Sequence, residues 1–189
     1  MQYTFLLRDD VYFHDSEVFP NGLGRRVTAS DFVYSFSRLL SPKLASPGSW
    51  VLSMLDRNFA GFTNGCKALN DTILIIRLSK PFPAFLGLVS MPYCFVVPHE
   101  AIEHYGGEFG RRPVGTGPFY MKYWRDGEKL VLRRNAHYFE LDNEGKRLPY
   151  LESVVVTFVV DKQSEFIEFI SGNIDMHSGV HASSKDELL

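Results

Sequence analysis

The sequence is poor in cysteine, in long apolar runs and in excess charge of either sign. Its two cysteines, Cys66 and Cys94, are too few for a disulfide framework and lack metal-site spacing. We expect two buried free thiols, with a single bridge as the open alternative. No apolar run reaches the about 18 residues of a membrane-spanning helix. The 20 Lys and Arg residues against 22 Asp and Glu give a net charge of −2, which argues against a nucleic-acid partner or an anionic membrane surface.

The remaining composition is that of a globular protein. Of the 189 residues, 45% are hydrophobic, and a chain of this length can bury roughly 70% of its unfolded surface as one large or two small domains. After Met1 the sequence enters a strand-like run with no signal-peptide pattern. Residues 183–189 resemble a capped helix start without its helix. We therefore expect a fragment of a longer chain.

Hydrophobic periodicity predicts helices on a mostly antiparallel sheet in the first part of the chain. A capping box at Thr28 and Asp31 opens a helix whose apolar residues keep helical spacing as far as Leu40. Asn70 and Asp71, between two strand-like runs, predict a hairpin with a primed turn. The other expected elements are paired strands at 3–7 and 11–13, strands at 67–69, 72–78 and 93–97, and helices at 50–55, 83–90 and 99–105.

A stiff passage, RRPVGTGPF at 111–119, separates this part from the rest. Pro113 and Pro118 hold the chain extended, whereas Gly115 and Gly117, on either side of Thr116, permit a sharp turn. We place a domain boundary there, with one part at 1–112 and a second at 113–189. The second part should contain a hairpin of strands 119–124 and 129–134, then a parallel βαβ unit of strand 153–160, helix 162–170 and strand 174–176.

No motif nominates a catalytic or metal-binding group. The Gly-Thr-Gly turn lacks the following helix that a phosphate loop requires, because Pro118 and a strand come next. His177 and His181 are four residues apart, but Gly179 lies between them and no further ligand supports a zinc site. We therefore expect no enzyme activity, no metal and no cofactor.

Other polar and aromatic groups have simple structural explanations. Glu165 and Glu168 form a carboxylate pair on the polar face of a predicted helix. Tyr120, Tyr123 and Trp124 are the aromatic candidates for lining a ligand cleft, although core packing is the favoured role for aromatic residues.

Five sequence blocks, in order, resemble one family. They are YTFLLRDDVYFHD at 3–15, VTASDFVYSF at 27–36, PVGTGPF at 113–119, LVLRRNAHY at 130–138 and GNID at 172–175. Together they are similar to the extracellular solute-binding proteins of peptide-type ABC importers, solute-binding protein family 5. One departure is visible: Ser16 stands where the family has a turn glycine, and Asn21-Gly22 follows in an inserted loop. This changes a loop and leaves the resemblance intact.

The resemblance implies a fold and a role. The fold is part of a type II periplasmic-binding-protein clamshell of mixed α+β (α/β) class, with 1–112 as an accessory subdomain and 113–189 as part of the first lobe. The second lobe is absent. The role is capture of a peptide or similar small solute for a membrane permease, by a monomer that is periplasmic or anchored outside the cytoplasm as a lipoprotein. A non-transport sensing module with the same fold is the alternative.

Ligand contacts are expected where the second part approaches the cleft. Ligands of open α/β sheets bind at the carboxyl ends of strands, which here indicates Met176, His177 and Ser178. A bulky residue at Ser178 should weaken binding in the complete protein. The segment alone should bind little, because one wall of the cleft is missing.

Overall fold

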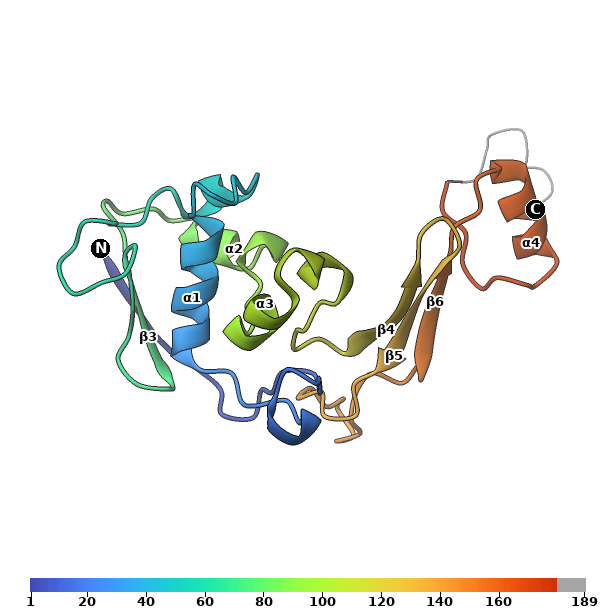
Figure 1. The fold of residues 1–189 in the computed structure, drawn as a ribbon, viewed down its shortest axis with the longest axis horizontal. Coiled ribbons are helices and arrows are strands. Elements are labelled where there is room, and N and C mark those ends of the chain that lie inside the picture. The colour runs from blue at the N-terminus through green and yellow to red at the C-terminus, as the bar shows by residue number, and fades with distance from the viewer. Residues whose placement is uncertain (180–189) are drawn as a thin grey trace. The chain divides into compact units, whose positions relative to one another are not determined.

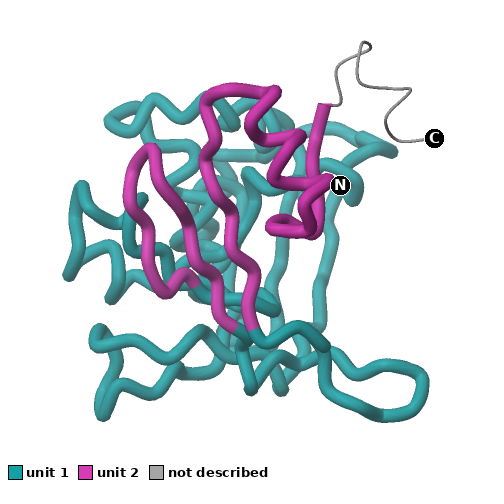
Figure 2. The backbone as a smooth tube through the Cα atoms, turned by 90° about the vertical axis from the view of Figure 1, so that its right-hand side faces the viewer, with its two compact units in different colours: residues 1–120, 134–152 teal, residues 121–133, 153–189 magenta. Residues whose placement is uncertain are grey.

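A computed structural model describes residues 1–179, and the chain gathers into two compact units (Figures 1 and 2). Unit 1 comprises Met1–Tyr120 and Arg134–Glu152. Unit 2 comprises Met121–Arg133 and the chain from Ser153 onward. The passage at 113–119 lies wholly in unit 1, and the chain leaves that unit inside the strand that follows. The expected boundary at 112/113, which concerns subdomains of a larger protein, stays a prediction.

Unit 1 contains a three-stranded antiparallel sheet covered by helices. Strands β1 (Gln2–Leu6), β2 (Cys66–Ala68) and β3 (Ile73–Arg77) have the order β1-β3-β2. The register pairs Thr4 with Ile75 and Lys67 with Ile75. The helices are α1 (Ala29–Leu39), α2 (Phe85–Val89) and α3 (His99–Tyr105), with short 3₁₀ helices at Pro20–Gly22, Ser49–Leu52, Pro92–Cys94 and Gly106–Arg111.

Apolar side chains from the sheet and from α1 form the main core of unit 1. Phe36 of α1, Ile76 of β3 and Phe85 of α2 are buried together in it. Burial of such side chains stabilises the unit by about 1.5–3 kcal/mol each. A smaller cluster gathers Phe13, Phe19 and Val114 near α3. The passage at 113–119 is thus tied into unit 1 by packing.

One arginine joins the inserted loop to two helices. The Arg25 guanidinium donates to both carboxylate oxygens of Asp31 in α1, at 2.8 and 2.7 Å, and to both of Glu100 in α3, at 2.6 and 2.9 Å. Its hydrogen bonds to Asp31 raise the pKa of Arg25. Burial is the strongest single influence on Glu100 and would raise its pKa, but the hydrogen bonds and charge of Arg25, with smaller contributions from the Glu100 backbone and from His99, together lower that pKa. Asp31 also accepts from the Thr28 N–H at 2.8 Å, so the predicted capping box is confirmed.

Unit 2 contains most of a second sheet and one helix. Strands β4 (Phe119–Arg125), β5 (Lys129–Arg134) and β6 (Ser153–Thr157) have the order β4-β5-β6, and β6 is antiparallel to β5 with Leu130 opposite Val156. The predicted hairpin is confirmed, and Gly127 takes φ +71° in its turn. Helix α4 (Lys162–Ile170) begins at Asp161, whose carboxylate accepts from the Ser164 N–H at 2.7 Å. No helix among the described residues is long and apolar enough to cross a bilayer.

Three local predictions of strands or strand pairing are wrong. Residues 11–13 do not pair with β1, because Tyr12 bridges to Arg26 instead. Residues 93–97 form no strand: Pro92, which lacks an N–H, opens a 3₁₀ helix through Cys94. Residues 174–176 are irregular and do not pair with the free edge of β6, so the expected βαβ unit stops after its helix.

The turn between β2 and β3 also differs from its predicted type. The loop has four residues, and Asn70 Oδ1 accepts from the N–H groups of Thr72 and Ile73 at 3.0 and 2.9 Å. An asparagine side chain can mimic a backbone turn in this way, so no positive φ is needed. The hairpin itself forms as predicted.

Candidate functional site

A buried histidine holds the Gly-Thr-Gly turn from a distance of about a hundred residues in sequence. His14, only 8% exposed, donates its backbone N–H to Gly115 O at 2.7 Å. Its ring Nδ1 lies 3.4 Å from the Gly115 nitrogen, and its Nε2 lies 2.9 Å from Gly117 O. A carbonyl can only accept, so Nε2 carries the hydrogen and Nδ1 accepts from Gly115. The neutral ring with its hydrogen on Nε2 therefore satisfies both contacts.

The surroundings of His14 favour that neutral form. Burial lowers the pKa of His14 below its ordinary value of 6.5, although the bond to Gly117 O acts in the opposite direction. Desolvation penalises the charged imidazolium, which could not accept from the Gly115 N–H. His14 is thus a fixed structural donor at neutral pH.

A buried asparagine donates to the same carbonyl. Asn135, 7% exposed, donates its side-chain Nδ2 to Gly117 O at 3.0 Å and its backbone N–H to Pro118 O at 2.8 Å. Its Oδ1 accepts from the His137 N–H at 3.0 Å, which fixes the orientation of the amide. We call His14, Gly115, Gly117, Pro118 and Asn135 the Gly117 junction.

The Gly117 junction brings together three blocks that lie far apart in the sequence. His14 belongs to the block at 3–15, Gly117 to that at 113–119 and Asn135 to that at 130–138. One carbonyl oxygen accepts a hydrogen bond from each of the other two blocks. The shared hydrogen bonds to Gly117 O therefore explain why this chain has both His14 and Asn135.

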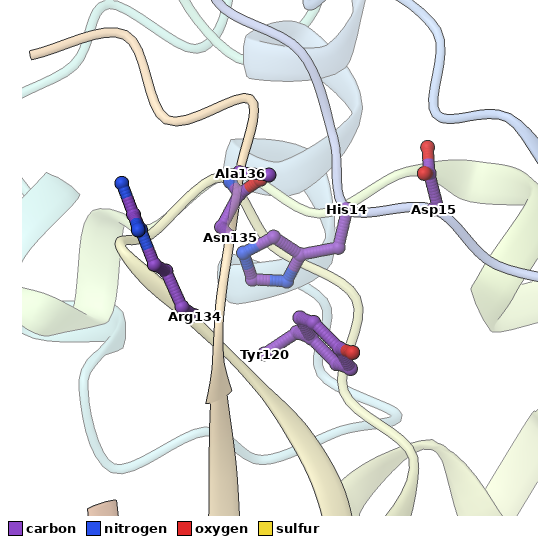
Figure 3. Close-up of a pocket in the computed structure, with 6 residues that line it drawn as sticks. All are labelled: His14, Asp15, Tyr120, Arg134, Asn135 and Ala136. Carbon is purple, nitrogen blue, oxygen red and sulfur yellow. The ribbon is translucent and has the colours of Figure 1, made fainter. Parts of the chain in front are cut away.

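A hollow of about 270 Å³ lies beside the junction (Figure 3). It is lined by His14, Asp15, Tyr120, Arg134, Asn135 and Ala136. The His14 and Tyr120 rings are 6.1 Å apart between centroids. Arg134 donates to Glu152 at 2.7 Å, and Asp15 accepts from the Gly24 N–H at 2.8 Å. Since both ring nitrogens of His14 are engaged, His14 is not free to act as a general base in the hollow.

The predicted ligand residues lie on the segment after α4. Met176 is 85% exposed, and Ser178 is also exposed. The His177 side chain, by contrast, is 2% exposed, with Nδ1 3.1 Å from Glu165 Oε1. The structure thus brings His177 to α4 and leaves its two neighbours at the surface. His181 lies outside the described residues.

The aromatic candidates separate in the same way. All three lie on β4. Tyr120 lines the hollow in unit 1, whereas Tyr123 and Trp124 are 36% and 40% exposed. Sequence reasoning missed His14 and Asn135. The sequence signal was that His14 and Asn135 both stand in blocks that resemble the family. Their shared hydrogen-bond partner, Gly117 O, becomes visible only in the folded structure.

The described residues hold neither a metal-binding cluster nor a reactive thiol. No group of three or more His, Cys, Asp or Glu side chains among them could hold a metal ion. Cys66 and Cys94 are free and buried. Burial raises the pKa of Cys66 to about 12 and that of Cys94 to about 11, so both thiols stay neutral and weakly nucleophilic at neutral pH.

Comparison with known proteins gives consistent matches along the chain. The family described as bacterial extracellular solute-binding proteins, family 5 Middle, matches residues 1–188. The periplasmic oligopeptide-binding protein OppA of Salmonella typhimurium is 31% identical over 185 residues, covering 92% of this chain and 32% of that protein. The periplasmic murein peptide-binding protein MppA of Escherichia coli is 29% identical over 199 aligned positions, covering 99% and 34%.

Solved structures agree with the sequence matches. The murein tripeptide-binding protein MppA of Escherichia coli superposes with a TM-score of 0.80 at 29% identity, over 100% of this chain and 36% of that one. Helicobacter pylori DppA in complex with the peptide STSA gives a TM-score of 0.81 at 25% identity, over 100% and 37%. The chain thus spans about a third of the length of the proteins that it matches.

Proposed function

This chain belongs to family 5 of the bacterial extracellular solute-binding proteins, and we propose that it is a fragment of the substrate-binding component of an ABC importer. The observation that carries the proposal is the match along nearly the whole chain to proteins named for binding oligopeptides and murein peptides. The mixed α/β architecture is that of type II periplasmic binding proteins of this family. The complete protein captures a solute by closure of two lobes and performs no chemistry.

The solute that these matches favour is a peptide. OppA and MppA are named for binding peptides, and DppA was solved with the peptide STSA bound. Other relatives are named for deoxycholate and glutathione, and MoaA was solved with mannopinic acid. Fold alone does not fix a ligand, so peptide stands as the first candidate and a similar small solute as the second.

The segment supplies one wall of the site in this proposal. Residues 1–112 form the accessory subdomain and residues 113–189 part of the first lobe, with the boundary at 113–118. Met176, His177 and Ser178 form the ligand-side loop. The exposure of Met176 and Ser178 supports this assignment, because groups that meet a ligand must be reachable from solvent.

The partners and location follow from the family. In this proposal the complete protein is periplasmic, or it is anchored to the membrane outside the cytoplasm. It acts as a monomer that delivers its solute to ABC permease subunits. OppA and MppA are themselves described as periplasmic.

The test is calorimetry on the complete protein with three probes: trialanine, glutathione and deoxycholate. We expect trialanine to bind most tightly. Ser178→Trp should weaken that binding at least tenfold, because a large side chain would fill the ligand side of the loop. The matched control is Ser53→Trp, at an exposed serine in unit 1, which should change the affinity less than twofold. A wild-type protein that binds none of the probes would contradict the proposed function. An unchanged affinity in Ser178→Trp would contradict the placement of Ser178 at the ligand site.

A further inference from the structure

The segment after α4 alternates between exposed and buried side chains. Met176 is 85% exposed and Ser178 is exposed, while the His177 side chain between them is 2% exposed. A polar side chain buried between exposed neighbours on an irregular segment needs a physical cause. That cause lies in the contacts of His177 with α4.

The imidazole of His177 packs on the apolar side chains of α4. Its ring centroid lies 6.1 Å from that of Phe166 and 6.1 Å from that of Phe169. Its Nδ1 lies 3.1 Å from Glu165 Oε1, and Lys162 Nζ binds the other oxygen of Glu165 at 2.6 Å. The charged groups that face His177 from α4 are therefore Glu165 directly and Lys162 through it.

A second carboxylate of α4 holds the same segment one turn further along. Asn173 donates its backbone N–H to Glu168 O at 2.9 Å and its side-chain Nδ2 to Glu168 Oε2 at 2.8 Å. Gly172, at φ +74°, makes the reversal that these contacts require. Glu165 and Glu168 thus have a role beyond a solvated helix face, because each holds one point of the returning chain.

The anchored segment leaves polar groups available for a ligand. The N–H groups of Met176, His177 and Ser178 donate to no backbone carbonyl of another described residue. Backbone groups without a partner pair with water or with a ligand. A segment held at His177 presents these groups, together with the Ser178 hydroxyl, in one conformation.

We propose that His177 is a positioning residue that fixes the ligand-side loop against α4 so that Met176 and Ser178 meet a peptide. It acts through packing on Phe166 and Phe169 and through Glu165, and it does not itself contact the peptide. Holding a loop in its bound conformation strengthens binding because less ordering entropy is lost on association. This inference rests on the proposed function.

The experiment compares loop variants of the complete protein in two assays. Calorimetry measures the Kd for trialanine, and amide hydrogen exchange of residues 173–178 in the ligand-free protein measures loop anchoring. His177→Ala should raise the Kd about tenfold and speed exchange. His177→Phe, which keeps an aromatic ring against Phe166 and Phe169, should lie between His177→Ala and wild type. The matched control is His104→Ala, at an exposed histidine 3.9 Å from Glu17, with no change in either assay.

A double-mutant cycle separates positioning from a general loss of stability. Glu165→Gln should raise the Kd about threefold in the wild-type background and leave it unchanged in His177→Phe, since the partner nitrogen is already absent. Equal effects of Glu165→Gln in both backgrounds would overturn the proposed contact.

Two other results would overturn the proposal. Faster exchange with unchanged Kd would show that the loop lies outside the ligand site. A raised Kd with unchanged exchange would show that His177 meets the ligand itself. A wild-type protein that binds none of the three probes would overturn the proposed function, and this role with it. That case would be distinguished by the exchange effect of His177→Ala, which would persist.

Discussion

Replacement of Asn135 by alanine tests whether the Gly117 junction holds unit 1 together. The change removes the side-chain donor to Gly117 O at 3.0 Å and the acceptor of the His137 N–H at 3.0 Å. Gly117 O keeps its bond from His14 Nε2 at 2.9 Å, so this carbonyl is not orphaned. The substitution therefore removes two hydrogen bonds and a buried side chain, and it leaves no unsatisfied carbonyl at Gly117.

The magnitude follows from those two bonds. Each is worth about 1 kcal/mol net, and His137 is exposed, so water can satisfy its N–H after the change. We expect Asn135→Ala to lower the free energy of unfolding by about 2 kcal/mol. With an m-value of about 2 kcal/mol/M for a chain of this size, the urea midpoint should fall by about 1 M.

The assay is urea unfolding followed by circular dichroism. The control is Asn143→Ala, at an exposed asparagine of the loop 136–152, which should shift the midpoint by less than about 0.25 M, the equivalent of a surface substitution. Equal midpoints for Asn135→Ala and wild type would refute the role assigned to the junction.

Two further predictions concern His14 and Gly24, which lies beside the backbone of Phe13 and His14. Burial lowers the pKa of His14, so protons bind more readily to the unfolded chain. The stability that neutral His14 provides is thus present above pH 6.5 and is lost as pH falls toward its folded pKa. His14→Gln, which can still donate to Gly117 O, should flatten the fall in urea midpoint between neutral and acidic pH, and an unchanged slope would contradict this. Gly24→Ala would place a Cβ 1.9 Å from Phe13 O and should cost about 1–3 kcal/mol, whereas Gly110→Ala, with nothing within 4 Å, should be neutral in the same assay.

Elements with local causes could be predicted from the sequence. The Thr28–Asp31 capping box and the apolar spacing that follows it specify α1, because both act within a few residues. Gly127 specifies the β4–β5 turn and Gly172 ends α4, since both glycines take the positive φ that a reversal needs. The resemblance to solute-binding family 5 also came from local blocks, and the family match confirms it.

Features that depend on distant partners could not be predicted. Residues 93–97 and 174–176 are apolar enough for strands, but a strand needs a neighbouring edge that local pattern does not reveal. His14 and Asn135 meet at Gly117 O across 103 and 18 residues of chain. The burial of His177 against α4 likewise depends on the return of the chain after Gly172.

The central claim is that this chain is part of a protein that captures a peptide or a similar small solute. Native mass spectrometry of the complete protein, purified without added ligand, tests it most directly. We predict a bound population heavier than the apoprotein by the mass of a short peptide, released on denaturation and sequenced by fragmentation. A protein that carries no solute and binds none of trialanine, glutathione and deoxycholate would contradict the account.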